Sequence, residues 1–546
     1  MTHAFELART RVTLFEALLR ARDARGGKYK ILEDHERKPL SYDDIVRAAF
    51  ALGGKLDTLI KKRETAGVML PTGAGCAVTF FALQAIGRTP AMLNFTAGIM
   101  NIRSAIEQAN VRKILTSRTF IKLAKLEALE AELKKHATLI YLEDVRKSID
   151  FGDKVIALVK GSFPRLFAAK GSPDDTAVIL FTSGSYGTPK GAVLSHANLV
   201  ANAEQGYAHV PFEPDWSFFS PLPMFHSFGL LGGVLLPLFT GHKTFLFPSP
   251  LAVKEIPKLI KDSGSNVFFA TDTFAQQYAR NADDEDMKCI RLMVLGAERV
   301  KPETRELYMK RFGVELLEGY GATEASPLIS VNVPGRNRYG TVGQFVPAIE
   351  WRLETVPGIE GGKRLFVRGP NVMRGYLDPT KPFGIDLLPQ GWHDTGDVVD
   401  VDEDGYIRIL GRVKRFAKWF VVRGSLNAVE GYASQVWPHN THAAVALPDS
   451  RKGERIILFT DLDGAEVGQL SAWAKDNGAS ELAIPKRIVP IEEIPVLGSG
   501  KIDSVVLQRM AAERFAEAKA AWRQLLSRRR CPATYYTKNP GAEAGA

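Results

Sequence analysis

A run of glycine and hydroxyl residues stands out in the sequence: Phe181-Thr182-Ser183-Gly184-Ser185-Tyr186-Gly187-Thr188-Pro189-Lys190-Gly191. It follows an apolar run, Ala177 to Phe181, short enough for a buried strand. It precedes the start of a helix for which Ser195 is the expected N-cap. A loop of this kind between a strand and a helix favours phosphate binding, because glycine lets the backbone approach the anion while hydroxyl and N–H groups donate to its oxygens. Lys190 adds a positive charge.

Three interpretations of this run compete. An ordinary surface turn has the same composition. A Walker P-loop requires Gly-Lys-Ser/Thr, and the order Pro189-Lys190-Gly191 excludes it. The run instead resembles the signature of adenylate-forming enzymes, the superfamily of acyl-CoA synthetases, luciferases and peptide-synthetase adenylation domains, and departs from it at Tyr186. The resemblance implies that ATP is bound by Thr182, Ser183, Gly184, Ser185, Gly187 and Lys190.

The composition indicates a multidomain globular protein. The chain has 546 residues, 45% of them hydrophobic and 24% charged. This length exceeds what one hydrophobic core ordinarily holds, so two or more domains are expected. Its three cysteines are far apart and match no disulfide or metal pattern, which suits a reducing cytoplasm. The start of the sequence lacks the layout of a signal peptide. The longest apolar region, Pro221 to Phe247, contains polar residues and is expected to be buried protein, not a bilayer span.

The formal net charge of +10 allows attraction to acidic partners. An acidic carrier protein, an anionic membrane surface and nucleic acid are all negatively charged and are the candidate partners. No zinc-finger, helix-turn-helix or RNA-binding signature accompanies it, so we expect no nucleic-acid partner. A cytoplasmic protein, either free or at the inner face of the membrane, is the resulting expectation.

Strand and helix patterns alternate through the first part of the chain. Ser41-Tyr42-Asp43-Asp44 predicts a capped helix start. Short strands are expected at 67–70, 90–93, 111–116, 266–270 and 291–295. This alternation predicts an α/β fold of mainly parallel sheets covered by helices, with ligands beyond the carboxyl ends of the strands.

A second motif, Glu318-Gly319-Tyr320-Gly321-Ala322-Thr323-Glu324, is similar to the superfamily's Y-G-x-T-E. The resemblance implies that Tyr320 and Gly321 contact the adenine, that Thr323 bonds a phosphate or the substrate carboxylate, and that Glu324 binds Mg²⁺. A carboxylate suits this hard, oxygen-seeking ion. By the same resemblance Gly296-Ala297-Glu298, a turn at a strand end, lies beside the adenine. A glycine-rich surface turn is the alternative for each.

A third motif, Trp392-His393-Asp394-Thr395-Gly396-Asp397, resembles W-x-x-T-G-D, and Gly411-Arg412-Val413-Lys414 resembles G-R-x-K. Asp397 would accept bonds from both ribose hydroxyls, and Arg412 would contact ribose or phosphate. The residues between them predict a hairpin, with strands at 398–401 and 406–410. His226, in an apolar run, falls where the superfamily carries an aromatic or His residue at the mouth of the acyl pocket, and the apolar residues after it would help to line that pocket. A structural His and a plain core helix are the alternatives.

The resemblance also implies three regions. Residues 1–414 would form the large domain with the ATP and acyl sites, residues 415–512 a small mobile α+β domain, and residues 513–546 a helical and then disordered tail. The last motif, Pro495 to Asp503, carries Lys501, the catalytic lysine that would contact the reacting carboxylate and the α-phosphate.

Within the superfamily the chain resembles the acyl-acyl carrier protein synthetase portion of 2-acylglycerophosphoethanolamine acyltransferases, in the stretches 222–229, 318–327, 411–418 and 497–501. The resemblance implies that a fatty acid is activated with ATP and Mg²⁺ and passed to the thiol of acyl carrier protein or coenzyme A, feeding phospholipid acylation. Where the superfamily continues with a Gly-rich turn after Lys418, this chain has Trp419-Phe420-Val421-Val422-Arg423-Gly424. Three alternatives therefore stay open: a ligase that adenylates but transfers poorly, a non-catalytic acyl- or nucleotide-binding homologue, and an adenylating enzyme for amino acids.

Overall fold

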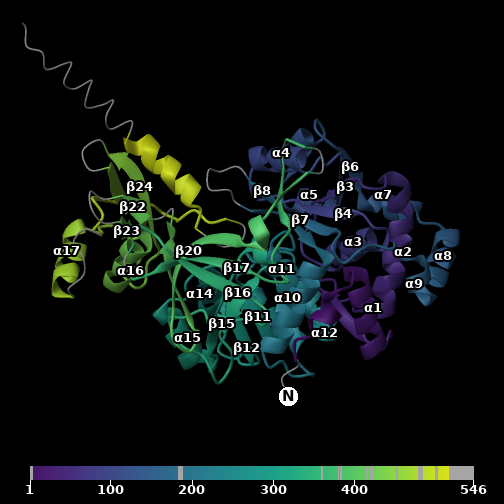
Figure 1. Cartoon of the computed structure of the whole chain (residues 1–546), viewed down its shortest axis with the longest axis horizontal. Coiled ribbons are helices and arrows are strands. Elements are labelled where there is room, and N and C mark those ends of the chain that lie inside the picture. The colour runs from purple at the N-terminus through teal and green to yellow at the C-terminus, as the bar shows by residue number, and fades with distance from the viewer. Residues whose placement is uncertain are drawn as a thin grey trace, which may run out of the picture. The chain divides into compact units, whose positions relative to one another are not determined.

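The computed structural model describes residues 4–182, 189–357, 359, 361–378, 380–381, 384–413, 416–418, 423–449, 453–477, 484–497 and 502–515 (Figure 1). The chain divides into two units. The first comprises Met1–Phe416 and Val496–Ile502, and the second Ala417–Pro495 and Asp503–Ala546. Each unit has a hydrophobic core of its own.

An eight-stranded sheet forms one half of the first unit, in the order β19-β18-β8-β7-β4-β3-β5-β6. The five strands from β7 to β6 run parallel, and β8, β18 and β19 are antiparallel. The strands are β3 (Thr65–Val68), β4 (Thr89–Met92), β5 (Lys113–Thr116), β6 (Thr138–Tyr141), β7 (Thr176–Thr182), β8 (Lys190–Ser195), β18 (Gly375–Leu377) and β19 (Ile385–Leu387).

A nine-stranded sheet forms the other half, in the order β15-β14-β13-β12-β11-β9-β10-β1-β2. Its six strands from β13 to β1 are parallel. The strands are β1 (Lys30–Asp34), β2 (Leu40–Ser41), β9 (Ser217–Ser220), β10 (Lys243–Leu246), β11 (Val267–Ala270), β12 (Leu292–Leu295), β13 (Leu316–Gly321), β14 (Leu328–Val331) and β15 (Gln344–Phe345). The predicted α/β class with mainly parallel sheets is confirmed.

Helices connect the parallel strands, because neighbouring parallel strands need a crossover connection. They are α1 (Leu14–Arg25), α2 (Tyr42–Leu59), α3 (Ala74–Ala85), α4 (Ile99–Gln108), α5 (Arg118–Leu123), α6 (Glu127–Leu133), α7 (Leu142–Ser148), α8 (Phe151–Ser162), α9 (Pro164–Phe167), α10 (His196–His209), α11 (Ser227–Leu230), α12 (Leu236–Thr240), α13 (Ile256–Ser263), α14 (Asp272–Asn281) and α15 (Pro302–Phe312). Both predicted N-caps are confirmed: Ser41 closes a capping box with Asp44, and Ser195 closes one with Asn198.

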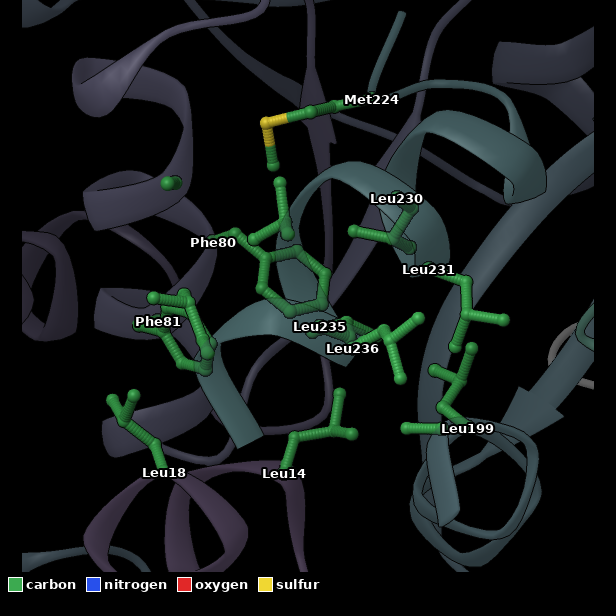
Figure 2. Packing of buried hydrophobic residues seen from close by; sticks show 14 of the residues in the cluster. Leu14, Leu18, Phe80, Phe81, Leu199, Met224, Leu230, Leu231, Leu235 and Leu236 are labelled. Atoms are coloured by element: carbon green, nitrogen blue, oxygen red, sulfur yellow. The ribbon is translucent and has the colours of Figure 1, made fainter. Parts of the chain in front are cut away.

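The core of the first unit is packed from helices that are far apart in sequence. Its centre is the apolar segment that ends in α12, with a π-helical turn, Leu231–Leu235, between α11 and α12. Figure 2 shows it against α1, α3 and α10 through Leu14, Leu18, Phe80, Phe81, Leu199, Met224, Leu230, Leu231, Leu235 and Leu236. The expectation that residues 221–247 are buried protein is confirmed.

One connection differs from the expected strand–loop–helix order. Between the glycine-rich run and α10 the chain forms β8, which pairs antiparallel with β7 and sets Thr182 opposite Lys190. The run therefore joins two strands of a hairpin, because Gly191 to Leu194 is apolar and is buried in the sheet. Residues 183–188 themselves lie outside the described part of the chain.

The second unit contains a three-stranded sheet, β24 (His442–Asp449), β25 (Gly453–Thr460) and β26 (Arg487–Pro490). Helices α16 (Leu426–Val436) and α17 (Val467–Asp476) contribute to its core, and β22 (Phe416–Lys418) pairs with β23 (Arg423–Ser425). Residues 504–515 are helical. In the described ranges of both units, no helix combines the length and the apolar character needed to cross a bilayer.

Candidate active site

Three sheets of the first unit meet at the residues assigned to nucleotide binding. The third is an antiparallel sheet of β16 (Glu350–Thr355), β17 (Lys363–Arg368), β20 (His393–Val401) and β21 (Ile407–Arg412). Tyr320 lies near the end of β13 in the nine-stranded sheet, and Lys190 begins β8 in the eight-stranded sheet. Asp397 and Arg412 lie opposite each other on β20 and β21, which form the predicted hairpin.

Asp397 is the centre of the first contact group. Its side chain is almost fully buried. One carboxylate oxygen, Oδ2, accepts a hydrogen bond of 2.5 Å from the Tyr320 hydroxyl, and Oδ1 forms an ion pair of 2.9 Å with Nε of Arg412. Burial, followed by the charge of Asp397, raises the pKa of Tyr320 well above its usual value, and the charge of Asp397 also raises the pKa of Arg412. The tyrosine is therefore a neutral donor, and the guanidinium keeps its charge.

Glu324 is the centre of the second group. Its Oε1 accepts a hydrogen bond of 2.6 Å from the hydroxyl of Tyr376, and its carbonyl accepts one of 2.8 Å from the Met373 amide. The ammonium group of Lys190 lies 4.8 Å from the centroid of the Tyr376 ring. Burial first, then the charge of Glu324, raises the pKa of Tyr376. One tyrosine thus contacts both the predicted metal ligand and the predicted phosphate-binding lysine.

Tyr376 was missed by the sequence reasoning. It belongs to none of the motifs quoted above, and its signal is purely spatial. It reaches the site because β18 pairs with β8, setting Tyr376 opposite Ala192. The tyrosine–carboxylate bond then joins the eight-stranded sheet to the turn that follows β13 in the nine-stranded sheet.

The loop that carries His226 also meets this turn. Oγ of Ser227 lies 3.2 Å from Oγ1 of Thr323. The His226 ring lies 5.0 Å from the Phe225 ring, at the residue that precedes α11. The structure thus places the residue after His226 against Thr323, whereas the substrate-positioning role of His226 stays a prediction.

Close backbone approach explains why position 321 of the second motif is a glycine. A Cβ atom on Gly321 would lie 2.3 Å from the carbonyl oxygen of Pro327, a distance that real Cβ atoms do not adopt. Glycine therefore lets β13 turn closely into the segment that carries Thr323 and Glu324.

The turn after β12 lies against the same region. A Cβ on Gly296 would lie 3.3 Å from the Phe228 ring, and Ala297 has a left-handed φ of 70°. Oε2 of Glu298 accepts hydrogen bonds from the backbone N–H and the hydroxyl of Thr273, of 3.0 and 2.9 Å, at the start of α14. This gives Glu298 a helix-capping contact, and the place of the turn beside the adenine stays a prediction.

Several predicted residues fall outside the described part of the chain: Ser183, Gly184, Ser185, Gly187 and Lys501. The described neighbours Thr182 and Lys190 lie opposite each other on β7 and β8, at the two ends of the predicted phosphate loop. The block after Lys418 is only partly described, from Arg423 onward. The roles of these residues stay predictions.

The donor set suits a magnesium ion that is shared with a nucleotide. Across the described ranges, no three His, Cys, Asp or Glu side chains gather into a metal cage. Mg²⁺ is commonly held by one or two carboxylates together with substrate phosphates and water. Glu324, oriented by Tyr376, fits that mode.

The AMP-binding enzyme family matches residues 19–377, well over half of the sequence. The chain belongs to the AMP-binding enzyme family. The predicted adenylate-forming superfamily is thereby confirmed, and so is ATP with Mg²⁺ as the family's cofactor pair. The narrower likeness to acyl-acyl carrier protein synthetases stays a prediction.

Curated relatives of this AMP-binding enzyme include fatty-acid ligases. A long-chain-fatty-acid–CoA ligase of Salmonella typhimurium is 31% identical over 346 residues, which is 60% of this chain and 60% of the relative. A medium-chain fatty-acid–CoA ligase of Escherichia coli is 29% identical over 367 residues, 63% of this chain and 62% of the relative. The chain thus matches about three fifths of the length of these relatives.

Solved structures share the fold over nearly the whole chain. A benzoate CoA ligase from Burkholderia xenovorans LB400 is 21% identical with a TM-score of 0.75, covering 91% of this chain and 99% of that one. An anthranilate CoA ligase in complex with anthranoyl-AMP is 20% identical with a TM-score of 0.76, covering 94% and 100%. At these identities the likeness concerns the fold of this AMP-binding enzyme and not its substrate.

Proposed function

We propose that this AMP-binding enzyme is an AMP-forming acid–thiol ligase that activates a fatty acid. The observation that carries the proposal is the pair of oriented carboxylates, Asp397 held by Tyr320 and Glu324 held by Tyr376, with Lys190 over the second tyrosine. A ribose acceptor, a metal carboxylate and a phosphate-side cation are the groups that an adenylating site needs. The fatty-acid ligases among the relatives support the choice of acid.

In the first step an oxygen of the fatty carboxylate attacks the α-phosphorus of ATP, and the bond from that phosphorus to the pyrophosphate oxygen breaks. Acyl-adenylate and pyrophosphate result. Asp397 fixes the ribose, and Lys190 and the hydroxyl-rich loop hold phosphate oxygens. Glu324 would hold Mg²⁺, which would supply positive charge to neutralise the phosphates. Lys501 supplies a further cation where negative charge builds, a contribution typically worth about 3 kcal/mol. Thr323 and His226 position the carboxylate and the acyl chain.

In the second step a phosphopantetheine thiol, losing its proton, attacks the acyl carbon, and the bond to AMP breaks. Coenzyme A is the acceptor named in the relatives, and acyl carrier protein is the alternative from the sequence resemblance, which would feed phospholipid acylation. The bulky residues at 419–422, which stand where the superfamily has a Gly-rich turn, favour slow transfer after normal adenylation. Equal, normal rates of both steps would refute this last point.

Pyrophosphate release from Mg·ATP tests the proposal. Fatty acids of different chain length are compared, each with coenzyme A, with acyl carrier protein, and with neither, and amino acids serve as the contrasting substrates. Release that depends on a fatty acid, with thioester on one thiol, identifies the ligase and its acceptor. Binding of ATP without release under any condition would replace the proposal by a binding-only homologue, and release only with amino acids would change the substrate class.

A further inference from the structure

Helix α8 buries small residues against the protein and exposes its large apolar ones, the opposite of an ordinary amphipathic surface helix. Ala157 and Gly161 are its buried residues. A Cβ on Gly161 would lie 2.8 Å from Cγ of Arg47 on α2, and Asp153 forms an ion pair of 2.6 Å with Lys55 of the same helix. α8 is therefore seated on α2 through small and polar groups, which leaves its large apolar side chains on the outside.

The exposed side continues through α9. We call it the α8–α9 face, and it consists of eight large apolar residues that are 43 to 80% exposed: Phe151, Val155, Ile156, Leu158, Val159, Phe163, Leu166 and Phe167. In Figure 1 both helices lie at the outer edge of the first unit. Single exposed apolar residues are ordinary, but a contiguous set of this kind marks an interaction surface.

α9 is fastened so that its apolar residues stay outside. Pro164 is buried, and Arg165 forms ion pairs with Glu16 at 3.1 Å and with Asp23 at 2.8 Å, both on α1. Leu166 and Phe167 follow on the open side. The face is thus anchored on α2 and α1 by small and charged side chains, while its large apolar side chains stay exposed.

Positive charges flank the face. With 3.6 residues per turn, Lys154 and Lys160 fall on opposite borders of the apolar stripe that contains Val155 and Leu158. The acidic residue nearest in sequence to Lys154, Asp153, is already paired with Lys55. A helix with an apolar face bordered by lysines, in a chain of net charge +10, is the pattern of helices that lie in the interface of an anionic membrane.

We propose that the α8–α9 face docks on the surface of an anionic lipid bilayer. The apolar side chains enter the boundary between headgroups and acyl chains, and Lys154 and Lys160 extend their ammonium groups to the lipid phosphates. A second copy of the chain fits less well, because it would bring lysines of like charge together around the same stripe. The proposal goes beyond the ligase function and does not depend on it.

Co-sedimentation of the full chain with vesicles tests the proposal, without nucleotide, so that the result is independent of ligase activity. Vesicles of phosphatidylcholine alone are compared with vesicles that also contain phosphatidylglycerol. We expect binding to the anionic vesicles that weakens with salt. The variant L158S/L166S should bind them roughly 100-fold more weakly, since two leucines no longer enter the lipid. K154E/K160E should also lose the anionic preference.

The matched control is L123S/L251S, because these two leucines are 78 and 63% exposed elsewhere on the first unit. It should bind as the unchanged chain does. The proposal is overturned if the unchanged chain stays in the supernatant with anionic vesicles at low salt, or if L158S/L166S and the control bind equally. It is also overturned if the unchanged chain does not bind vesicles but forms a dimer, and L158S/L166S dissociates that dimer. The face would then join two copies.

Discussion

Replacement of Asp397 by Asn should separate the proposed ribose-binding role of this residue from its place in the fold. The amide has nearly the shape of the carboxylate, so the packing between β20 and β21 is kept. What changes is the number of acceptor positions. A carboxylate offers about four lone-pair sites, and Tyr320 and Arg412 use one on each oxygen. The remaining two suit the two ribose hydroxyls.

An Asn side chain has one carbonyl oxygen with about two acceptor sites. At most two of the four contacts can therefore keep a side-chain oxygen of residue 397 as acceptor when ribose binds, and the others are lost or reverse, with the uncharged amide as donor. Hydrogen bonds to charged groups contribute about 1.5–3 kcal/mol each, against about 1 kcal/mol for neutral pairs. A net loss of about 3 kcal/mol follows, and kcat/KM for ATP should fall roughly 100-fold.

ATP-dependent pyrophosphate release under saturating fatty acid measures this change, and thermal melting in the same buffer separates lost binding from unfolding. The matched control is Asp400→Asn on the same strand, where the aspartate is half-exposed and lies 3.6 Å from Arg408. It should change kcat/KM less than about threefold. If Asp397→Asn is folded and also stays within threefold, Asp397 does not hold the ribose and the assignment fails.

Three other changes have defined outcomes. Tyr376→Phe removes the hydroxyl that orients the predicted metal ligand and should raise the Mg²⁺ concentration for half-maximal activity about tenfold, whereas Tyr406→Phe, which removes a hydroxyl bonded to a surface carbonyl, should not. Burial lowers the pKa of His196 to about 4 from 6.5, so stability that it contributes above pH 6.5 is lost as the pH falls towards 4. In urea unfolding His196→Asn should lose about 3 kcal/mol less than the unchanged chain over this range, while His209, His242 and His393, whose pKa values burial also lowers, still contribute. Gly321→Ala forces a Cβ against the Pro327 carbonyl and should reduce the free energy of unfolding by about 1–3 kcal/mol in the same assay; an unchanged midpoint would contradict the close approach.

Local signals in the sequence predicted local structure well. Ser41 and Ser195 are helix N-caps because their hydroxyls and the residues three positions later satisfy the free amides of the first turn. The error at β8 has a comparable physical origin. Gly191 to Leu194 is too short to show a period, and only pairing with β7 and β18 makes it a strand.

Contacts between residues of different sheets could not be predicted from the sequence. The motifs named Tyr320, Glu324 and Asp397, but nothing in their spacing indicates that a tyrosine on β18 should bond Glu324. The α8–α9 face escaped for a similar reason. A periodic apolar pattern predicts which residues share a side of a helix, and it does not show that Ala157 and Gly161 are the ones that face inward.

The choice of tyrosine as the donor has an electrostatic consequence for the site. Tyr320 and Tyr376 each orient a carboxylate, and burial and the neighbouring negative charge raise the pKa of both hydroxyls. They therefore stay neutral and orient the two carboxylates without adding positive charge, while Asp397 has Arg412 as its ion-pair partner. A lysine in either place would form an ion pair and reduce the field available to a ligand. At Glu324, the proposed Mg²⁺ ligand, the negative charge is thus retained, while the ammonium group of Lys190, the proposed phosphate contact, lies 4.8 Å from the centroid of the Tyr376 ring.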